Sequence, residues 1–261
     1  MAYRLAGSGE PLLLLHGIGA TKDDFSELIP RLAEHFEVLA VDLPGHGSSP
    51  MLEVRPTVAA ITDAIIADLD ARGLDRVHVL GNSLGGRIAL EMATRGRALS
   101  VVALSPSGLG LPPERVFQGG LMTAARIANK LRNPLIERMS RNVVGRTALT
   151  AGLRALPWRA SRRESLSVKG GFAEAEGCWS MLWDAILWDV PIGMPRITCP
   201  VTLAQGVLDM VASAQTVRYT PLIPGARFVP LPYAGHAPQS DTPDTIVELV
   251  RRTAARAHAT T

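Results

Sequence analysis

Cysteine is scarce in this sequence of 261 residues, which contains two, Cys178 and Cys199. The two are far apart, belong to no C-x-x-C pair and have no histidine nearby. This pattern excludes a disulfide framework and a cysteine–histidine zinc site. We therefore expect two buried thiols and no bound metal.

Long apolar runs are also absent, and no stretch approaches the ~20 residues that a membrane-spanning helix needs. Near the N-terminus only Arg4 precedes the apolar residues 11–15. That run is too short for the core of a signal peptide, and it lacks a small-residue cleavage site. We expect a cytoplasmic protein without a membrane span.

A strong excess of one charge is missing too, because the formal net charge is only +3. The positive charge is concentrated in residues 106–195, which hold 12 Lys/Arg and 7 Asp/Glu. These arginines are dispersed, as they are on a solvated helical surface. Since no nucleic-acid-binding motif occurs either, we expect no nucleic-acid partner.

Short apolar runs and amphipathic stretches alternate along the first part of the chain. The apolar runs occupy residues 11–15, 36–41, 76–80 and 99–104. Their near-continuous apolar character is typical of strands buried on both faces. Helical periodicity lies between them, at residues 24–34 and 57–71. This alternation predicts an α/β fold with a mostly parallel, doubly wound sheet.

The alternation stops between residues 106 and 195, where amphipathic helices follow one another and all four tryptophans lie. It resumes after Pro200, with apolar runs at 201–204 and 227–231 and a last helix over residues 242–257. We therefore assign residues 1–105 and 196–261 to one α/β core. Residues 106–195 are predicted to be a helical insertion in that core.

A serine lies between two glycines in Gly81-x-Ser83-x-Gly85, where an apolar strand runs directly into a helix-forming segment. A reversal this sharp strains the backbone at the serine, and larger residues at the glycine positions would collide with neighbouring backbone. The turn exposes the hydroxyl at the positive end of the following helix, where negative charge develops during acyl transfer. Ser83 is the candidate nucleophile.

A serine hydroxyl needs a base, and the base needs an acidic group that orients it. Among the six histidines, His236 follows the last predicted strand in a loop whose side chains reach the carboxyl edge of the sheet. Asp209 follows a strand that runs into a glycine turn. Asp241 and Asp244 look like caps of the last helix. We therefore expect Ser83, Asp209 and His236 to be nucleophile, acid and base.

The oxyanion of an acyl-transfer reaction needs two backbone N–H donors. Leu84 supplies one, because it directly follows the nucleophile. Ile18 is expected to supply the other from the glycine loop after the first core strand. The residues predicted to shape these two turns are His16, Gly17, Gly81 and Gly85.

Five motifs occur in a fixed order: His16-Gly17-Ile18-Gly19, Asp42-Leu43-Pro44-Gly45-His46-Gly47-Ser48, Gly81-Asn82-Ser83-Leu84-Gly85-Gly86, Gly206-Val207-Leu208-Asp209 and Gly235-His236. With them the chain resembles the α/β-hydrolase-fold serine hydrolases. The resemblance implies that residues 106–195 form a helical lid over the site. Members of the family usually have one or two strands before the first motif. Here either residues 3–5 form an edge strand, or the chain is shortened at its N-terminus.

Together the residues and the resemblance predict hydrolysis of a carboxylic ester or thioester through an acyl-enzyme, without a metal or organic cofactor. The expected partner is a small molecule with an acyl or carbonyl group. One alternative comes from Asn82, since Gly-Asn-Ser-x-Gly-Gly resembles the elbow of bacterial hydrolases that cleave carbon–carbon bonds in ring-fission (meta-cleavage) products. Those enzymes carry tryptophan after the catalytic histidine, where this chain has Ala237. A non-catalytic small-ligand-binding protein of the same fold is the other alternative.

Overall fold

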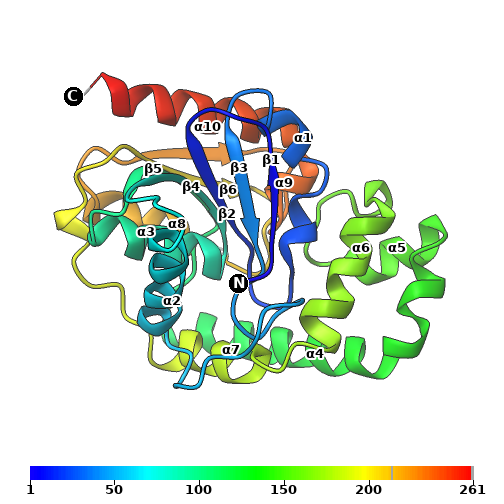
Figure 1. Cartoon of the computed structure of the whole chain (residues 1–261). Coiled ribbons are helices and arrows are strands. Elements are labelled where there is room, and N and C mark those ends of the chain that lie inside the picture. Colours follow the sequence, from blue (N-terminus) through cyan, green and yellow to red (C-terminus); the bar gives the residue numbers. More distant parts are fainter. Residues whose placement is uncertain (213, 260–261) are drawn as a thin grey trace.

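A computed structural model describes residues 1–212 and 214–259, and its centre is one seven-stranded sheet (Figure 1). The strands are β1 (Tyr3–Ala6), β2 (Pro11–Leu15), β3 (Glu37–Val41), β4 (Val77–Asn82), β5 (Ala98–Leu104), β6 (Val201–Gly206) and β7 (Arg227–Leu231). Their order is β1-β3-β2-β4-β5-β6-β7, and every pair is parallel except β1 with β3. The predicted α/β fold with a mostly parallel sheet is confirmed.

The central strands are apolar throughout because both faces of the sheet are covered. In β2, Leu13 and Leu15 belong to one hydrophobic cluster, while Leu12 and Leu14 belong to another on the opposite face. This is the two-residue alternation of a strand, with leucine on both sides. In the parallel register Leu15 lies beside Gly81 of β4, which brings the first glycine loop next to the serine turn.

Helices pack on both faces of the sheet. The core helices are α1 (Ile29–Leu32), α2 (Val58–Asp70), α3 (Leu84–Thr94), α8 (Gln215–Tyr219), α9 (Pro238–Asp241) and α10 (Pro243–His258), with short turns η1 (Lys22–Phe25), η4 (Met194–Arg196) and η5 (Thr220–Leu222). Side chains of α2 and α3 join the first cluster, whereas those of α1 and α10 join the second. The sheet is therefore doubly wound, with α10 on the opposite face from α2 and α3 (Figure 1).

Two elements are expected in the N-terminal region, an edge strand at residues 3–5 and a helix at residues 24–34, and only the strand is present. Residues 3–5 do form an edge strand, since β1 pairs with β3. The single helix predicted over residues 24–34 is wrong, because the chain forms the 3-10 turn η1 and then the one-turn helix α1. Pro30 lacks the N–H that would bond to the carbonyl of Ser26, so the hydrogen bonds of a single helix are interrupted there.

A second group of helices lies entirely between β5 and β6. Its elements are α4 (Pro112–Met139), α5 (Val143–Thr150), η2 (Pro157–Arg159), α6 (Arg162–Val168), the π-helix η3 (Lys169–Ala173) and α7 (Cys178–Leu187). They have their own hydrophobic cluster, which includes Met122, Phe172 and Leu182. We call this group the helical insertion. It projects beyond the carboxyl end of the sheet (Figure 1).

The described residues include no helix that is both long enough and apolar enough to cross a membrane. Positions 213, 260 and 261, which fall in the predicted core segment 196–261, lie outside the described residues.

Candidate active site

Ser83 lies on a strained turn between β4 and α3. Its φ of 55° and ψ of −116° are unusual for a residue with a side chain, and such strain concentrates at functional sites. The turn is fixed from outside, because the Ser83 N–H donates to the carbonyl oxygen of Leu104 at 2.8 Å. The hydroxyl therefore stands at the N-terminus of α3, as the sequence pattern indicates.

Glycine is required at positions 81 and 85 because backbone segments approach each other very closely at this turn. A Cβ at Gly85 would lie 2.1 Å from the carbonyl oxygen of Leu15, and one at Gly81 would lie 2.2 Å from that of Gly85. Both of these oxygen atoms belong to the backbone, so they cannot move aside as the end of a flexible side chain can. The turn can form only if both positions lack a side chain.

We expect Gly85→Ala to lower the free energy of unfolding by about 3 kcal/mol, because the added methyl group must push strand β2 away from the turn. Gly120→Ala is the matched control, since Gly120 is an exposed helical residue with nothing within 4 Å of the added Cβ. It should raise stability by about 0.5–1 kcal/mol. Urea unfolding of both variants makes the comparison, and equal stabilities would contradict the steric account.

His236 and Asp209 form a buried hydrogen-bonded pair at the same edge of the sheet. The Nδ1 atom of His236 lies 3.1 Å and 3.0 Å from the two carboxylate oxygens of Asp209. The Asp209 carboxylate also accepts the N–H groups of Val211 and Ala212, at 2.8 and 2.9 Å. Burial raises the pKa of Asp209, but His236 and these donors outweigh it and bring the pKa down to about 2. Because an ionised carboxylate only accepts, Nδ1 carries the proton and Nε2 is left free.

Asn82 holds the histidine loop against the serine turn. Its side-chain nitrogen donates to the carbonyl oxygen of His236 at 2.8 Å and to that of Leu104 at 3.3 Å. Asn82 lies in β4 directly before Ser83, so these bonds fix the position of His236 relative to the nucleophile. The hydrogen bonds give this asparagine a positioning role that requires no contact with a substrate.

Ser83 and His236 line one cavity between the core and the helical insertion. In the described chain Ser83 Oγ forms no hydrogen bond, so no bond joins it to the imidazole in this structure. Most of the wall is apolar, and its side chains include Met122, Val168, Phe172, Leu182, Ile186 and Val211. The cavity therefore suits a substrate whose bulk is hydrocarbon.

Ile18 and Leu84 both lie beside the nucleophile. Ile18 lines the cavity, and a Cβ at Gly17 would lie only 3.1 Å from the Cβ of Ser83, so the loop backbone passes close to the serine. Leu84 is the first residue of α3, where an N–H has no partner within the helix. Within the described residues neither of the two N–H groups donates a hydrogen bond.

His16 shapes the loop that carries Ile18. Its Nε2 accepts the N–H of Leu43 at 2.9 Å, so Nδ1 holds the proton and donates to the carbonyl oxygen of Gly17 at 2.8 Å. Burial lowers the pKa of His16 to about 4. The nearby His46 is also buried, with its pKa lowered to about 3 by burial and by His16. Both imidazoles are neutral, and their nitrogen atoms form hydrogen bonds with backbone groups.

The helical insertion is tied to the histidine loop by Asp241. One carboxylate oxygen of Asp241 accepts the N–H groups of Gly235 and Ala155, at 2.9 and 2.8 Å. In addition, Ala237 donates its N–H to the carbonyl oxygen of Leu153 at 2.8 Å. The prediction that Asp241 caps the last helix is wrong, because its carboxylate bonds these distant N–H groups instead. Asp244 lies in the first turn of α10 and pairs with Arg31.

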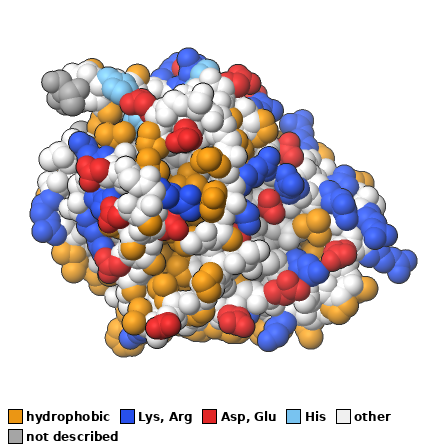
Figure 2. Space-filling view, in the orientation of Figure 1, with side chains coloured by type: hydrophobic (Ala, Val, Ile, Leu, Met, Phe, Trp, Pro, Cys, Tyr) orange, Lys and Arg blue, Asp and Glu red, His pale blue; other side chains and the backbone are white. Residues whose placement is uncertain are grey.

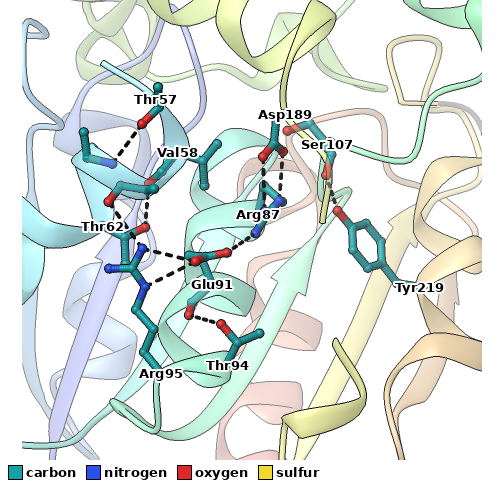
Figure 3. Close-up of polar contacts among 12 residues, drawn as sticks. Thr57, Val58, Thr62, Arg87, Glu91, Thr94, Arg95, Ser107, Asp189 and Tyr219 are labelled. Carbon is teal, nitrogen blue, oxygen red and sulfur yellow. Dashed lines mark hydrogen bonds and ion pairs between the residues drawn. The ribbon is translucent and has the colours of Figure 1, made fainter. Parts of the chain in front are cut away.

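The end of the insertion is tied to α3 by an ion pair that Figure 3 shows beside Glu91. Arg87 binds both carboxylate oxygens of Asp189, at 2.9 and 3.1 Å, and also Glu91 at 3.0 Å. The side chains of Arg87 and Asp189 are 3% and 7% exposed. Since α3 begins at Leu84, this contact connects the insertion to the helix of the serine turn.

We expect Arg87→Met to lower the free energy of unfolding by about 3–5 kcal/mol, because it leaves the buried Asp189 carboxylate without its partner. Arg95→Met is the matched control. Arg95, the residue after α3, pairs with Glu91, but its side chain is 26% exposed, so the loss should stay below about 1 kcal/mol. A double variant, Arg87→Met with Asp189→Leu, should recover much of the lost stability. Equal losses of unfolding free energy in Arg87→Met and Arg95→Met would contradict this account.

One cluster within the described residues has the composition of a metal site. Glu10, His78 and His258 bring one ligand atom each to within 4.8 Å of the others. Glu10 accepts from His258 at 3.0 Å and lies 3.4 Å from Nε2 of His78. Two imidazoles and a carboxylate could hold a divalent cation. Glu10 and His78 lie at the amino ends of β2 and β4, opposite Ser83, so this cluster is not part of the candidate site.

The outer surface of the molecule carries no single charged field on the face that Figure 2 shows. Lysines and arginines are numerous there over the helical insertion, but acidic and apolar side chains lie between them (Figure 2). This mixed surface agrees with the dispersed arginines in the sequence of the insertion.

Asp24 and Ser167 are cavity residues that the sequence pattern does not single out. Asp24 lies in η1, and Ser167 lies in α6 of the insertion, 143 positions later in the sequence. No motif contains either of them. Only the packing of the insertion against η1 brings them to the cavity wall.

Known proteins resemble this chain in sequence and in fold. A model of the alpha/beta hydrolase family matches residues 12–249. A pimeloyl-[acyl-carrier protein] methyl ester esterase of Neisseria meningitidis serogroup B is 48% identical over 83 residues, which cover 31% of this chain and 30% of that protein. The chain spans only about a third of the length of this and other curated relatives that are at least 30% identical.

Solved structures resemble the chain over almost its whole length. A hydrolase from Pseudomonas aeruginosa is 26% identical, with a TM-score of 0.75 over 96% of this chain and 92% of that one. A meta-cleavage product hydrolase from Pseudomonas fluorescens is 20% identical, with a TM-score of 0.71 over 98% of this chain and 94% of that one, a likeness of fold alone. By its sheet, its helices and the family match over most of its length, the chain belongs to the alpha/beta hydrolase family.

Proposed function

We propose that the protein is a serine hydrolase that cleaves a carboxylic ester or thioester through an acyl-enzyme. The observation that carries the proposal is the buried hydrogen bond from His236 Nδ1 to Asp209. It leaves Nε2 of His236 as a base in the cavity that also contains Ser83. A strained serine, a free imidazole nitrogen and an orienting carboxylate are what nucleophilic acyl transfer requires.

In the first half of the reaction Ser83 Oγ attacks the carbonyl carbon of the substrate while its proton passes to Nε2 of His236. The tetrahedral oxyanion accepts the free N–H groups of Ile18 and Leu84. The bond to the leaving group then breaks, and His236 gives its proton to the leaving alcohol or thiol. The product of this half-reaction is an ester of Ser83 with the acyl group.

In the second half water takes the place of the alcohol. His236 removes a proton from water, the hydroxide attacks the acyl-enzyme carbonyl, and the proton returns to Ser83 Oγ. Asp209 stays ionised throughout and stabilises the imidazolium in each half. The residues provide every proton transfer of this cycle.

We further propose that the helical insertion, residues 106–195, acts as the lid of this site. Its side chains Met122, Phe172, Leu182 and Ile186 supply much of the apolar wall of the cavity. They would contact the acyl part of the substrate and exclude water from the oxyanion. The Neisseria relative is a methyl ester esterase, which supports an ester as the substrate.

A panel of p-nitrophenyl esters with acyl chains of different lengths, set beside a vinylogous diketo acid, tests the choice of bond. We expect hydrolysis of the esters and little turnover of the diketo acid, because Asn82 has a positioning role that requires no substrate contact. Turnover of the diketo acid with negligible esterase activity would replace this proposal with carbon–carbon hydrolysis. Turnover of neither class would favour a binding protein.

A further inference from the structure

The apolar cavity has a polar wall near η1. There Asp24 and Ser167 both line the cavity that also contains Ser83. Ile18, the predicted oxyanion donor, lines the same cavity. A purely hydrocarbon acyl group would offer this polar wall no hydrogen bond in place of the water that it displaced.

Ser167 is held rigidly at this wall. Its Oγ accepts the N–H of Thr21 at 2.9 Å and the hydroxyl of Thr21 at 3.1 Å, and the residue is only 3% exposed. Two accepted bonds use both lone pairs of a hydroxyl oxygen, so the hydroxyl proton remains available to a partner such as Asp24. The contact also docks α6 of the insertion on the segment that contains Asp24.

Asp24 differs from its acidic neighbours because no cation in the described residues pairs with it. Asp23 pairs with Arg163, and Asp42 pairs with Lys22. Arg154, whose charge lowers the pKa of Asp24, is engaged by Glu164 at 3.1 Å and by Asp241 at 3.5 Å. Asp24 is therefore a cavity carboxyl group without a counter-ion in the described structure.

Gln239 is a buried amide close to Asp24. Its side chain is 1% exposed, and neither its amide nitrogen nor its amide oxygen has a well-formed hydrogen bond among the described residues. It lies close enough to Asp24 to lower the pKa of that carboxyl, as Ser167 does. Burial and the charge of Glu164 outweigh both and raise the pKa of Asp24 to about 7. Near neutral pH the carboxyl group can therefore donate or accept a hydrogen bond.

We propose that Asp24 and Ser167 form a subsite for a hydroxyl group on the acyl part of the substrate, which makes the substrate a hydroxyacyl ester or thioester. A hydroxyl donates one hydrogen bond and accepts others, so it complements a carboxyl beside a serine. A carboxylate does not fit at this subsite, because Arg154 is already engaged and Glu164 adds negative charge beside Asp24. This inference rests on the proposed function and specifies its substrate.

The test compares three esters: p-nitrophenyl butanoate, 3-hydroxybutanoate and 3-aminobutanoate. For the wild type we expect kcat/KM for the hydroxylated ester to exceed that for butanoate by about tenfold or more, the effect of one to two buried hydrogen bonds. Asp24→Leu should abolish this preference. Asp24→Asn, which keeps hydrogen-bonding atoms, should retain part of it. Asp23→Leu is the matched control and should retain all of it.

Equal kcat/KM for the two esters, an unchanged preference in Asp24→Leu or a preference for the amino ester would each overturn the subsite. If Asp24→Leu fails to fold, Ser167→Ala takes its place with the same expected loss. Hydrolysis of no ester at all would be a failure of the proposed function. Calorimetric binding of methyl 3-hydroxybutanoate and methyl butanoate to Ser83→Ala tests the subsite separately, and equal affinities there would overturn it.

Discussion

Replacing Ser83 with alanine is expected to lower kcat/KM for a p-nitrophenyl ester by about 10⁴- to 10⁶-fold, because the variant has no atom that can form the acyl-enzyme. The fold should persist, since the hydroxyl forms no hydrogen bond in the described chain. Any remaining rate would come from the oxyanion donors and from binding alone. Steady-state kinetics with a matched unfolding curve makes the measurement.

Ser107→Ala is the control for this variant. Ser107 also lines the cavity, and its backbone carbonyl accepts the hydroxyl of Tyr219 at 2.5 Å (Figure 3). That contact does not need the serine side chain, so kcat/KM should change by less than about tenfold, as for a residue outside the reaction. A loss in Ser83→Ala no larger than that in Ser107→Ala would remove Ser83 from the mechanism.

Asp209→Asn is expected to lower kcat by about 10⁴-fold, because an amide can donate to Nδ1 and so favour the wrong tautomer of His236. Asparagine has nearly the same shape, and it can still accept the N–H groups of Val211 and Ala212. Asp244→Asn, at an exposed carboxylate that pairs with Arg31, is the control and should leave kcat unchanged.

The pH dependence follows from the low pKa of Asp209. Since His236 and the N–H donors hold that pKa at about 2, the carboxylate stays ionised from neutral pH down to about pH 3. The pairing contributes stability above the unfolded pKa of about 4, and this contribution is lost as the pH falls through 2. Loss of activity between pH 5 and 7 must therefore come from other groups. Protonation of Asp209 above about pH 4, followed by ¹³C NMR of its carboxyl carbon, would contradict this assignment.

Much of the fold is readable from the sequence because its signals are local. Each central strand is a short apolar run, and the sharp turn at Ser83 demands glycine at 81 and 85 whatever surrounds it. The segment order also suffices to place Ser83, Asp209 and His236 together. All three follow strands of a parallel sheet, and the carboxyl ends of such strands lie at one edge.

The remaining features depend on contacts between distant segments. Asp24 becomes a cavity residue only because α6 packs on η1, and no periodicity encodes that packing. Asp241 resembles a helix cap in the sequence, yet it bonds to N–H groups of Gly235 and Ala155. Pro30 is the exception, because its missing N–H is a local signal that argues against a helix over residues 24–34.

The central claim is that Ser83 is an activated nucleophile, and labelling with a fluorophosphonate probe tests it most directly. Mass spectrometry of the digested wild type should find one adduct, on the peptide that contains Ser83. Ser83→Ala should carry none, and His236→Ala should react far more slowly because its serine has no base. An adduct on another residue, equal labelling of Ser83→Ala, or a folded wild type that does not react would contradict the account.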